Sequence, residues 1–277
     1  MDIFNLRMLL IAFLVFVPLE HLFGLRSAQK RFRTGLANDL SFALINAVIV
    51  KGALIAVVLC AMLVFDRIVP PSLRSSVAGQ PLWLQVMEIV VVADVGYYFA
   101  HRAMHHIPAL WRFHAIHHSS EDMDWAASFK IHPVDLILTK SASFIPVFAL
   151  GYSEQAIVVF GTIFYFHVAL VHSNTAIGFG PLKWLIASPQ FHHWHHAREK
   201  AAHDMNFAGQ LPALDALFGT LLLPGKDMPE RYGIEEETPR WLVPQLLYPF
   251  ARRANASGPP ESQSASAANQ DLARLGR

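Results

Sequence analysis

The sequence predicts an all-α integral membrane protein whose helices present clustered histidines at one side of a bilayer. Hydrophobic residues make up 53% of the chain and charged residues only 16%, against about a quarter charged in soluble domains. Ten of the fifteen histidines lie in two short windows, residues 101–118 and 192–196. The net charge of +1 gives no indication of nucleic-acid binding. The single cysteine, Cys60, excludes an intramolecular disulfide and a cluster held by cysteines.

Three apolar segments are long enough to cross a bilayer, which takes roughly 20 residues. They cover about residues 4–25, 40–65 and 81–100. The first ends in the acidic, bulky stretch LEHLFGL, which offers no small-residue cleavage site. We therefore expect a retained span and not a signal peptide. The third segment leads directly into His101.

A second apolar pair, residues 136–150 and 155–172, is joined by the turn-like Gly151-Tyr152-Ser153. Its first member is short for a crossing and carries Lys140, so a helical hairpin is expected. The predicted fold is thus about three full transmembrane helices plus a helical hairpin, with a cytoplasmic helical cap that carries the histidines. One membrane-embedded domain should cover residues 1–250, and the polar residues 251–277 should form a disordered tail.

Basic residues predict the orientation of the spans. The loop after the first span carries four of them, and the loop after the second span only two, Arg67 and Arg74. The four are Arg26, Lys30, Arg31 and Arg33. We therefore expect both histidine windows and the C-terminus in the cytoplasm, at what we take to be a bacterial inner membrane. This topology allows the two windows to meet in space.

The histidines recur at helical spacing. Residues three and four apart share one face of a helix, and His101 and His105 form such a pair. Two triplets repeat the spacing i, i+3, i+4: His114, His117 and His118, then His192, His195 and His196. Each set can converge three imidazoles, or two, on a single point. Imidazole suits iron, zinc, copper or nickel, and eight imidazoles exceed the four ligands of a closed zinc site. The pattern therefore predicts two metal ions.

Other histidines fit this pattern less well. His172 lies where the second hairpin helix should end, and is a further candidate ligand. His167, five residues earlier, is an additional candidate, although a helix would turn it away from His172. His106 and His193 fall out of phase with their neighbours and should lie on the surface or support the ligands. His132 precedes a proline and is expected to cap the hairpin.

Carboxylates near the histidines are candidates to orient the ligand rings from outside the metal site. Asp94 lies seven residues before His101, on the same helical face and within an apolar run. Asp204 follows the second histidine window. Glu121 and Asp135 are weaker candidates of the same kind.

Together these motifs resemble the sterol desaturase / fatty acid hydroxylase superfamily of membrane enzymes. Its histidine boxes correspond to HRAMHH (101–106), HAIHH (114–118) and HHWHH (192–196). Lesser landmarks agree as well: DVGYYFAHR, HHSSE, HP-x-D at 132–135, HSN at 172–174, SPQFHHWHH, DMNFAG and LDALFGT. The resemblance covers about residues 94–220 in the expected order.

The resemblance implies two iron ions that use O2 and two electrons to attack an unactivated C–H bond of a lipid. The implied ligands are His101, His105, His114, His117, His118, His172, His192, His195 and His196. His167 is an additional candidate that the family's boxes do not include. The chain has no fused haem-binding domain, and Gly178-Phe179-Gly180 is no dinucleotide fingerprint. A separate electron donor of the ferredoxin or cytochrome b5 type is therefore expected.

Several functions remain open at the level of sequence. We expect hydroxylation of a sterol, fatty acyl chain, ether lipid or carotenoid, with desaturation as the near alternative. A non-redox membrane protein that binds or transports metal would need polar residues throughout the spans, and the residues that interrupt them are Lys51 and Lys140. A zinc hydrolase would need a general base, and no H-E-x-x-H motif occurs.

Overall fold

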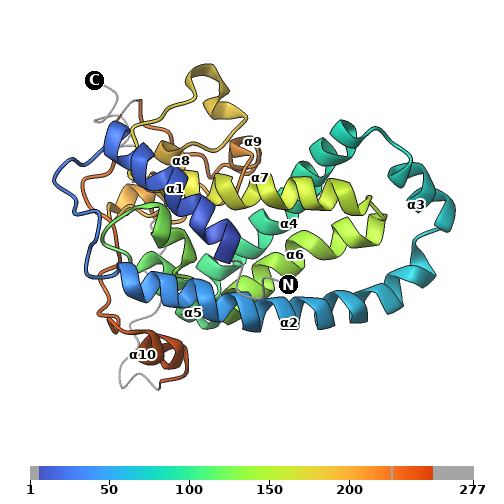
Figure 1. Ribbon diagram of the computed structural model, residues 1–277, viewed down its shortest axis with the longest axis horizontal. Helices are drawn as coiled ribbons and strands as arrows, with labels where there is room; N and C mark the ends of the chain where they lie inside the picture. Colours follow the sequence, from blue (N-terminus) through green and yellow to red (C-terminus); the bar gives the residue numbers. More distant parts are fainter. Residues whose placement is uncertain (1–5, 226, 252–277) are drawn as a thin grey trace.

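The computed structural model describes residues 6–225 and 227–251, and within them every regular element is a helix (Figure 1). Five helices are long and apolar enough to cross a membrane: α1 (Leu6–Phe23), α2 (Leu36–Ile68), α4 (Leu82–His106), α6 (Pro133–Leu150) and α7 (Glu154–His172). The shorter helices are α3 (Pro71–Ala78), α5 (Pro108–His118), α8 (Pro189–His195), α9 (Pro212–Phe218) and α10 (Leu242–Leu247). Four 3₁₀ turns complete the list: η1 (Trp125–Phe129), η2 (Gly180–Trp184), η3 (Lys200–Ala202) and η4 (Tyr248–Phe250).

The all-α class is confirmed, and the helices begin and end within a few residues of the expected bounds. The main difference is α4, which continues past Ala100 to His106 and so carries the first histidine pair on the spanning helix itself. Both arms of the expected hairpin are complete helices of 18 and 19 residues. Helix α3 was not expected. The predicted tail, apart from Ala251, lies outside the described residues.

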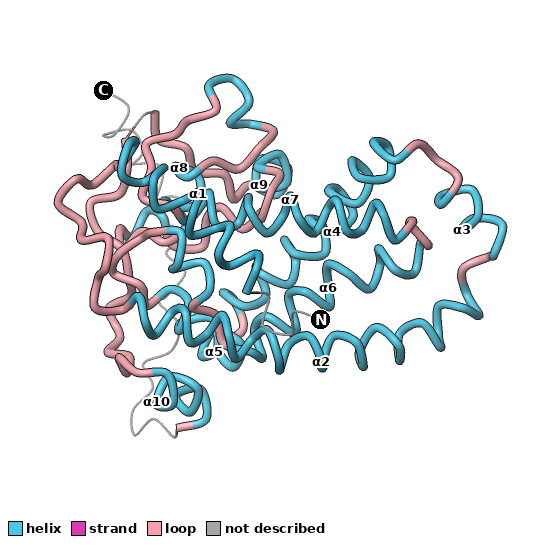
Figure 2. The backbone as a smooth tube through the Cα atoms, viewed as in Figure 1, coloured by secondary structure: helices cyan, strands magenta, loops and turns pink. Residues whose placement is uncertain are grey.

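The long helices run side by side, and most loops and short helices gather at one end of this bundle, whereas α3 lies at the other end (Figure 2). Helix α6 packs against both α2 and α4, and α7 packs against α4. The loop between α1 and α2, helix α5, the end of α7 and helix α8 all lie at the same end (Figure 1). Chain segments far apart in the sequence therefore meet there.

Two of the basic residues in the α1–α2 loop are bound within the fold. The guanidinium of Arg33 donates to the Asp124 carboxylate at 2.6 and 2.8 Å and to Asp39 at 2.5 Å. Arg26 donates to the backbone oxygens of Pro229 and Glu230. This loop is thus tied to the segments that surround the histidines.

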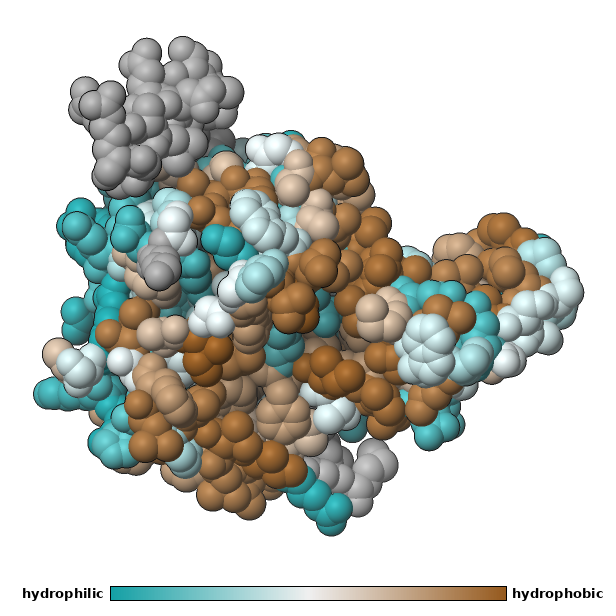
Figure 3. Space-filling model, turned by 90° about the horizontal axis from the view of Figure 1, so that it is seen from above, coloured by the Kyte–Doolittle hydropathy of each residue, from teal (hydrophilic) through white to brown (hydrophobic). Residues whose placement is uncertain are grey.

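The surface of the bundle has the distribution expected for a protein in lipid. Apolar side chains cover its middle, while hydrophilic groups gather at the end that carries the loops (Figure 3). Among the exposed residues are Leu59, Leu63 and Val158 on the long helices. Helices satisfy their backbone hydrogen bonds internally, which is the requirement for a chain that crosses hydrocarbon.

Proline positions the first two histidine sets. Pro108 is the first residue of α5, and it disfavours helical backbone at the residue before it. Ile107 is accordingly extended, with φ −98° and ψ 112°, and α4 ends there. Helix α5 therefore leaves in a new direction, so its histidines can face those of α4.

Helices α4 and α6 approach each other closely at Gly96. A side chain at this position would overlap the carbonyl oxygen of Ala142 and come within 3.2 Å of the Ser143 Cα atom. The contact is backbone against backbone, so no side-chain rotation can relieve it. Both helices carry residues of the candidate site, and their separation is consequently set by this glycine.

Replacing Gly96 with alanine should lower the stability of the folded protein by about 2 kcal/mol, because overpacking forces backbone shifts. Thermal unfolding in detergent micelles, followed by circular dichroism, measures the loss. The matched control is Gly52→Ala on α2, where an added Cβ meets nothing within 4 Å, and its melting temperature should be unchanged or slightly raised. Equal melting temperatures for the Gly96→Ala and Gly52→Ala variants would contradict the close contact.

Candidate metal centre

The nine histidines predicted to bind metal form two adjacent groups. The first consists of His101, His105, His114, His118 and His195, and the second of His117, His172, His192 and His196. Within each group the nitrogens that could bind an ion lie within 4.8 Å of one another. The groups are in contact, because the rings of His118 and His196 stack with centroids 4.4 Å apart.

In each histidine triplet two rings converge on one group, as the spacing allows, and the third ring joins the other group. On α5, His114 and His118 belong to the first group and His117 to the second. On α8, His192 and His196 belong to the second group and His195 to the first. The reason is angular: residues four apart on a helix diverge by about 40°, whereas residues i+3 and i+4 diverge by about 100°. Each triplet thus serves both groups, which makes the two groups one structural unit.

Within the groups, Nε2 atoms point at one another. In the first group the Nε2 atom of His114 lies 3.0 Å from that of His101 and 3.1 Å from that of His118. In the second, His172 Nε2 lies 3.2 Å from His117 Nε2 and 3.0 Å from His192 Nε2. These contacts are hydrogen bonds only if one ring of each pair carries its proton on Nε2, and the partners of the Nδ1 atoms decide this.

Most of the Nδ1 atoms face hydrogen-bond acceptors. His101 Nδ1 lies 2.7 Å from the carbonyl oxygen of Phe207, and His114 Nδ1 lies 2.7 Å from Asp135 Oδ2. His117, His172 and His195 face the carbonyl oxygens of Lys130, Val168 and Met205 in the same way. Since a carbonyl can only accept, the ring proton of each neutral histidine resides on Nδ1.

Two bare Nε2 lone pairs therefore face each other between His101 and His114, and again between His117 and His172. Such a contact repels unless a cation lies between the nitrogens. The arrangement fits a metal ion in each group, with imidazole ligands whose tautomer is fixed by their outer hydrogen bonds.

Burial keeps these rings neutral. The pKa values of His117, His118, His192 and His196 are all well below the ordinary value, mainly because of burial and then because of neighbouring imidazoles. Burial likewise lowers the pKa of His195 to about 3. Metal ligation requires the neutral ring, and these groups supply it at neutral pH.

Asp135 is the carboxylate in direct contact with a ligand ring. It lies in the first turn of α6 and is almost completely buried, as is His114. From the sequence Asp135 is a weaker candidate than Asp94, because the HP-x-D motif does not reveal which histidine the aspartate contacts. The negative charge of Asp135 holds the Nδ1 proton of His114 and makes Nε2 a stronger donor to a metal.

Asp94, the carboxylate expected to orient a ring, does something else. Its oxygens accept hydrogen bonds from the backbone amides of Gly209, Gln210 and Leu211, at 2.7 to 3.0 Å. It thereby holds the segment just after Phe207, whose carbonyl faces His101. Asp94 lies at one remove from the rings because the loop, which the sequence cannot place, comes between them.

Asp204 is closer to its expected place. Its Oδ1 atom lies 3.4 Å from His105 Nδ1, while His105 Nε2 has no hydrogen-bond partner. The backbone of Asp204 and of Asn206 is left-handed, with φ of 59° and 61°. The segment between α8 and α9 is thus bent sharply where it passes the first group.

His167 lies in neither group, in contrast to the expectation that added it to the ligands. Its Nε2 atom donates to the carbonyl oxygen of Ala187 at 2.8 Å. Five residues from His172, it faces away from that ring along α7. His106 is exposed and its Nδ1 faces the carbonyl of Arg102, while His132 accepts from the Val134 amide and caps α6 as expected.

His193 is buried and acts as a connector. Its Nε2 donates to the carbonyl oxygen of Ser173 at 3.1 Å, and its Nδ1 accepts from the Tyr232 hydroxyl at 2.7 Å. The guanidinium of Arg26 stacks over the Tyr232 ring. His193 therefore joins α8 to the end of α7, next to His172. Sequence reasoning placed it near the site but gave no sign of Tyr232.

A cavity of about 440 Å³ extends from the histidines into the helical bundle. His114 of the first group and His117 of the second border it, and its other walls come mainly from α2, α4, α6 and α7. Most of the lining is apolar, for example Leu136, Phe144, Phe160 and Phe164. The cavity gives a hydrocarbon chain access to both groups.

Comparison with known proteins agrees with this geometry. Residues 86–220 match the family described as fatty acid hydroxylase, a segment that contains all nine clustered histidines. Over this segment, about half of the chain, the sequence is similar to the fatty acid hydroxylase family. The resemblance inferred from the histidine boxes is thereby confirmed.

Individual relatives include three kinds of enzyme. The chain is 31% identical over 173 residues to the ornithine lipid hydroxylase OlsE of Rhizobium tropici, which covers 62% of this chain and 52% of that one. It is 31% identical over 132 residues to the human alkylglycerol monooxygenase, with 46% and 28% covered. It is 28% identical over 137 residues to a very-long-chain aldehyde decarbonylase of Oryza sativa, with 45% and 21% covered.

The chain thus spans about half the length of the ornithine lipid hydroxylase and less of the other two. No solved structure matches it.

Replacing Asp135 with asparagine should weaken metal binding by about 10- to 100-fold, the usual effect of removing a carboxylate behind a histidine ligand. The asparagine keeps the size of the side chain but loses the charge that holds the His114 proton. Metal content after equilibration with graded concentrations of a chelator measures the affinity. Asp122→Asn, an exposed neighbour of the site, is the control, and equal metal loss in both variants would contradict the role of Asp135.

Proposed function

We propose that this chain is an O2-dependent lipid hydroxylase in which the nine clustered histidines hold two iron ions. One observation carries the proposal. The apolar cavity in the bundle ends at His114 and His117, one residue from each histidine group. A lipid chain in that cavity therefore meets both groups at once, as a two-metal reaction requires.

The ligand set supports iron. Every clustered ligand is an imidazole, and imidazole suits iron as well as zinc, copper and nickel. The similarity to the fatty acid hydroxylase family favours iron among these. A bound pair of iron ions would supply the two-electron activation of O2 on which attack on an unactivated C–H bond depends.

The overall reaction consumes one C–H bond, one O2, two electrons and two protons, and yields an alcohol and water. The chain contributes position and exclusion of water. The walls of the cavity hold the lipid with the reacting carbon beside His114 and His117, and their apolar side chains limit the access of water to the reacting groups. Asp135 accepts the hydrogen bond from His114 Nδ1 and so holds the proton on that nitrogen.

Electrons come from a separate carrier in this proposal, of the ferredoxin or cytochrome b5 type. The single cysteine of the chain cannot hold an iron–sulfur cluster. The carrier would approach the loop-bearing end, which we place in the cytoplasm because the α1–α2 loop is basic. A bacterial inner membrane is the proposed location.

The substrate class follows from the cavity and the relatives. A mostly apolar cavity among membrane helices fits a lipid with an acyl or alkyl chain. The relatives named above act, by name, on an ornithine lipid and on alkylglycerol. The apolar lining also argues against a path for ions, which would need polar groups across the bundle.

His117 and His195 give the sharpest test, because each belongs to a different group from the other two histidines of its triplet. His117→Ala removes a ligand of the second group and His195→Ala one of the first. Wild-type protein should contain about two iron ions per chain, and each variant should contain less and lose its activity. His106→Ala, which alters an exposed ring outside both groups, is the control and should behave as wild type.

Activity is measured by the mass of the host lipids with and without each variant. A gain of one oxygen atom indicates hydroxylation, and a loss of two hydrogens indicates a desaturase with the same site. Wild-type protein that binds no iron, or lipids that do not change with His195→Ala, would refute the proposal.

A further inference from the structure

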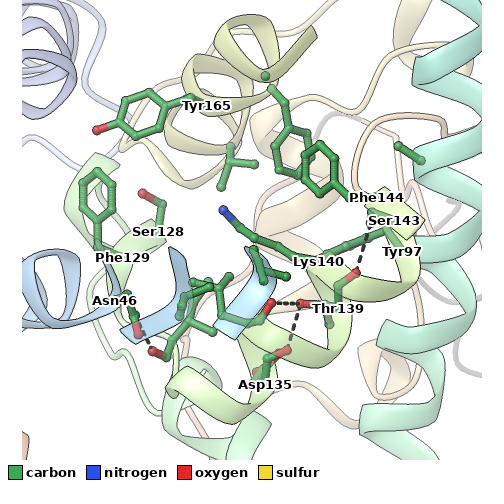
Figure 4. A pocket seen from close by; sticks show the side chains of 18 of the residues that line it. Asn46, Tyr97, Ser128, Phe129, Asp135, Thr139, Lys140, Ser143, Phe144 and Tyr165 are labelled. Carbon is green, nitrogen blue, oxygen red and sulfur yellow. Dashed lines mark hydrogen bonds between the residues drawn. The ribbon is translucent and has the colours of Figure 1, made fainter. Parts of the chain in front are cut away.

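Lys140 lies in the wall of the cavity without a partner. It is on α6, about 7.5 Å along the helix axis from Asp135. Figure 4 shows its amine in the middle of the ring of lining side chains. Among the described residues, no hydrogen bond or ion pair to this amine is formed.

The other polar side chains of α6 in this wall are satisfied. Asp135 accepts the Nδ1 proton of His114. Thr139 donates to the carbonyl oxygen of Asp135, and Ser143 to that of Thr139, both on the preceding turn. Lys140 is thus the exception on a face that is otherwise fully bonded.

The cavity offers Lys140 no free anion. Two carboxylates border it: Asp94, which is occupied by three backbone amides, and Asp135, which is occupied by His114. The other cation at its border, Lys51 on α2, is exposed. An ammonium among apolar walls is costly unless something pairs with it. An acidic group on the bound lipid would remove that cost.

We propose that Lys140 binds an acidic oxygen of the lipid substrate, a carboxylate or a phosphate. The ion pair holds the lipid in one register, so that a fixed stretch of its chain lies beside His114 and His117. The inference rests on the proposed function for the reaction that follows, but the binding itself needs neither iron nor turnover.

Three ligands with the same sixteen-carbon chain test the proposal: palmitate, hexadecyl phosphate and hexadecanol. Their binding to the full chain in nanodiscs of zwitterionic lipid is measured by equilibrium binding of the radiolabelled compounds, without reductant. Wild type should bind at least one of the two acidic ligands about tenfold more tightly than hexadecanol, since hydrogen bonds to charged groups have about this strength. The tighter of the two acids identifies the source of the oxygen.

Variants at position 140 separate charge from shape. Lys140→Met and Lys140→Gln should both lose the preference for the acidic ligand, whereas Lys140→Arg should keep it. Lys140→Met should also unfold at the same or a higher temperature than wild type, because it removes an unpaired cation. Should the methionine variant fail to fold, the glutamine variant carries the test. Lys51→Met is the matched control and should retain the preference.

Failure of this proposal can be told from failure of the proposed function. Three results overturn the role of Lys140 even if the protein hydroxylates lipid. They are equal binding of palmitate, hexadecyl phosphate and hexadecanol by wild type, a preference for the acidic ligand that survives Lys140→Met, and a preference that is lost with Lys51→Met. The converse result is wild-type protein that prefers the acidic ligand through Lys140 and yet binds no iron. That result supports the role of Lys140 and refutes the proposed hydroxylase function.

Discussion

The rest of this structure depends on the need to bring nine imidazole rings together with their Nε2 lone pairs facing inward. Bare lone pairs at 3.0 to 3.2 Å repel one another, so the protein must hold the rings in place by their other nitrogens. It does so mainly with backbone carbonyls, which come from η1, α7 and the segment after α8. The ends of four helices and two loops are therefore committed to one small volume.

The exchange of histidines between the two groups follows from ordinary helix geometry. A helix turned so that residues i and i+4 face one point directs residue i+3 to the side. Helices α5 and α8 use this in opposite senses, because α5 gives its pair to the first group and α8 gives its pair to the second. The two sites are consequently built as one object, and a change in the packing of either helix alters both.

The apolar lining of the cavity is suited to a protein in a bilayer. In the proposed function a hydrocarbon chain enters between the membrane helices and remains in an apolar environment until it reaches the histidines. The cavity that would provide this route is bordered by His114 and His117. Polar groups within it should then be few and satisfied. Most are: Thr139 and Ser143 bond to their own helix, and Asp94 and Asp135 support the site. Within the described part of the chain, Asn46 Oδ1 and Gln210 Nε2 lack hydrogen-bond partners, and Lys140 is the charged departure from this rule. Departures of this kind mark places where a ligand can complete the structure.

The sequence by itself determined the spanning helices, the turn at Gly151 and the phases of the histidines, because hydropathy and helical period are properties of short segments. It also identified the family. It did not determine which group each ring joins, since spacing defines angles within one helix and not the direction in which neighbouring helices face.

The roles of Asp135, Asp94 and His193 likewise depended on tertiary structure. Each bonds to a partner far away in the chain: His114, the amides of 209–211, and Tyr232. No local pattern encodes such partners. For the same reason Lys140 was visible in the sequence as an interruption of a span, but only the packing of α2, α4, α6 and α7 around it decided that it faces a cavity that ends at the histidines.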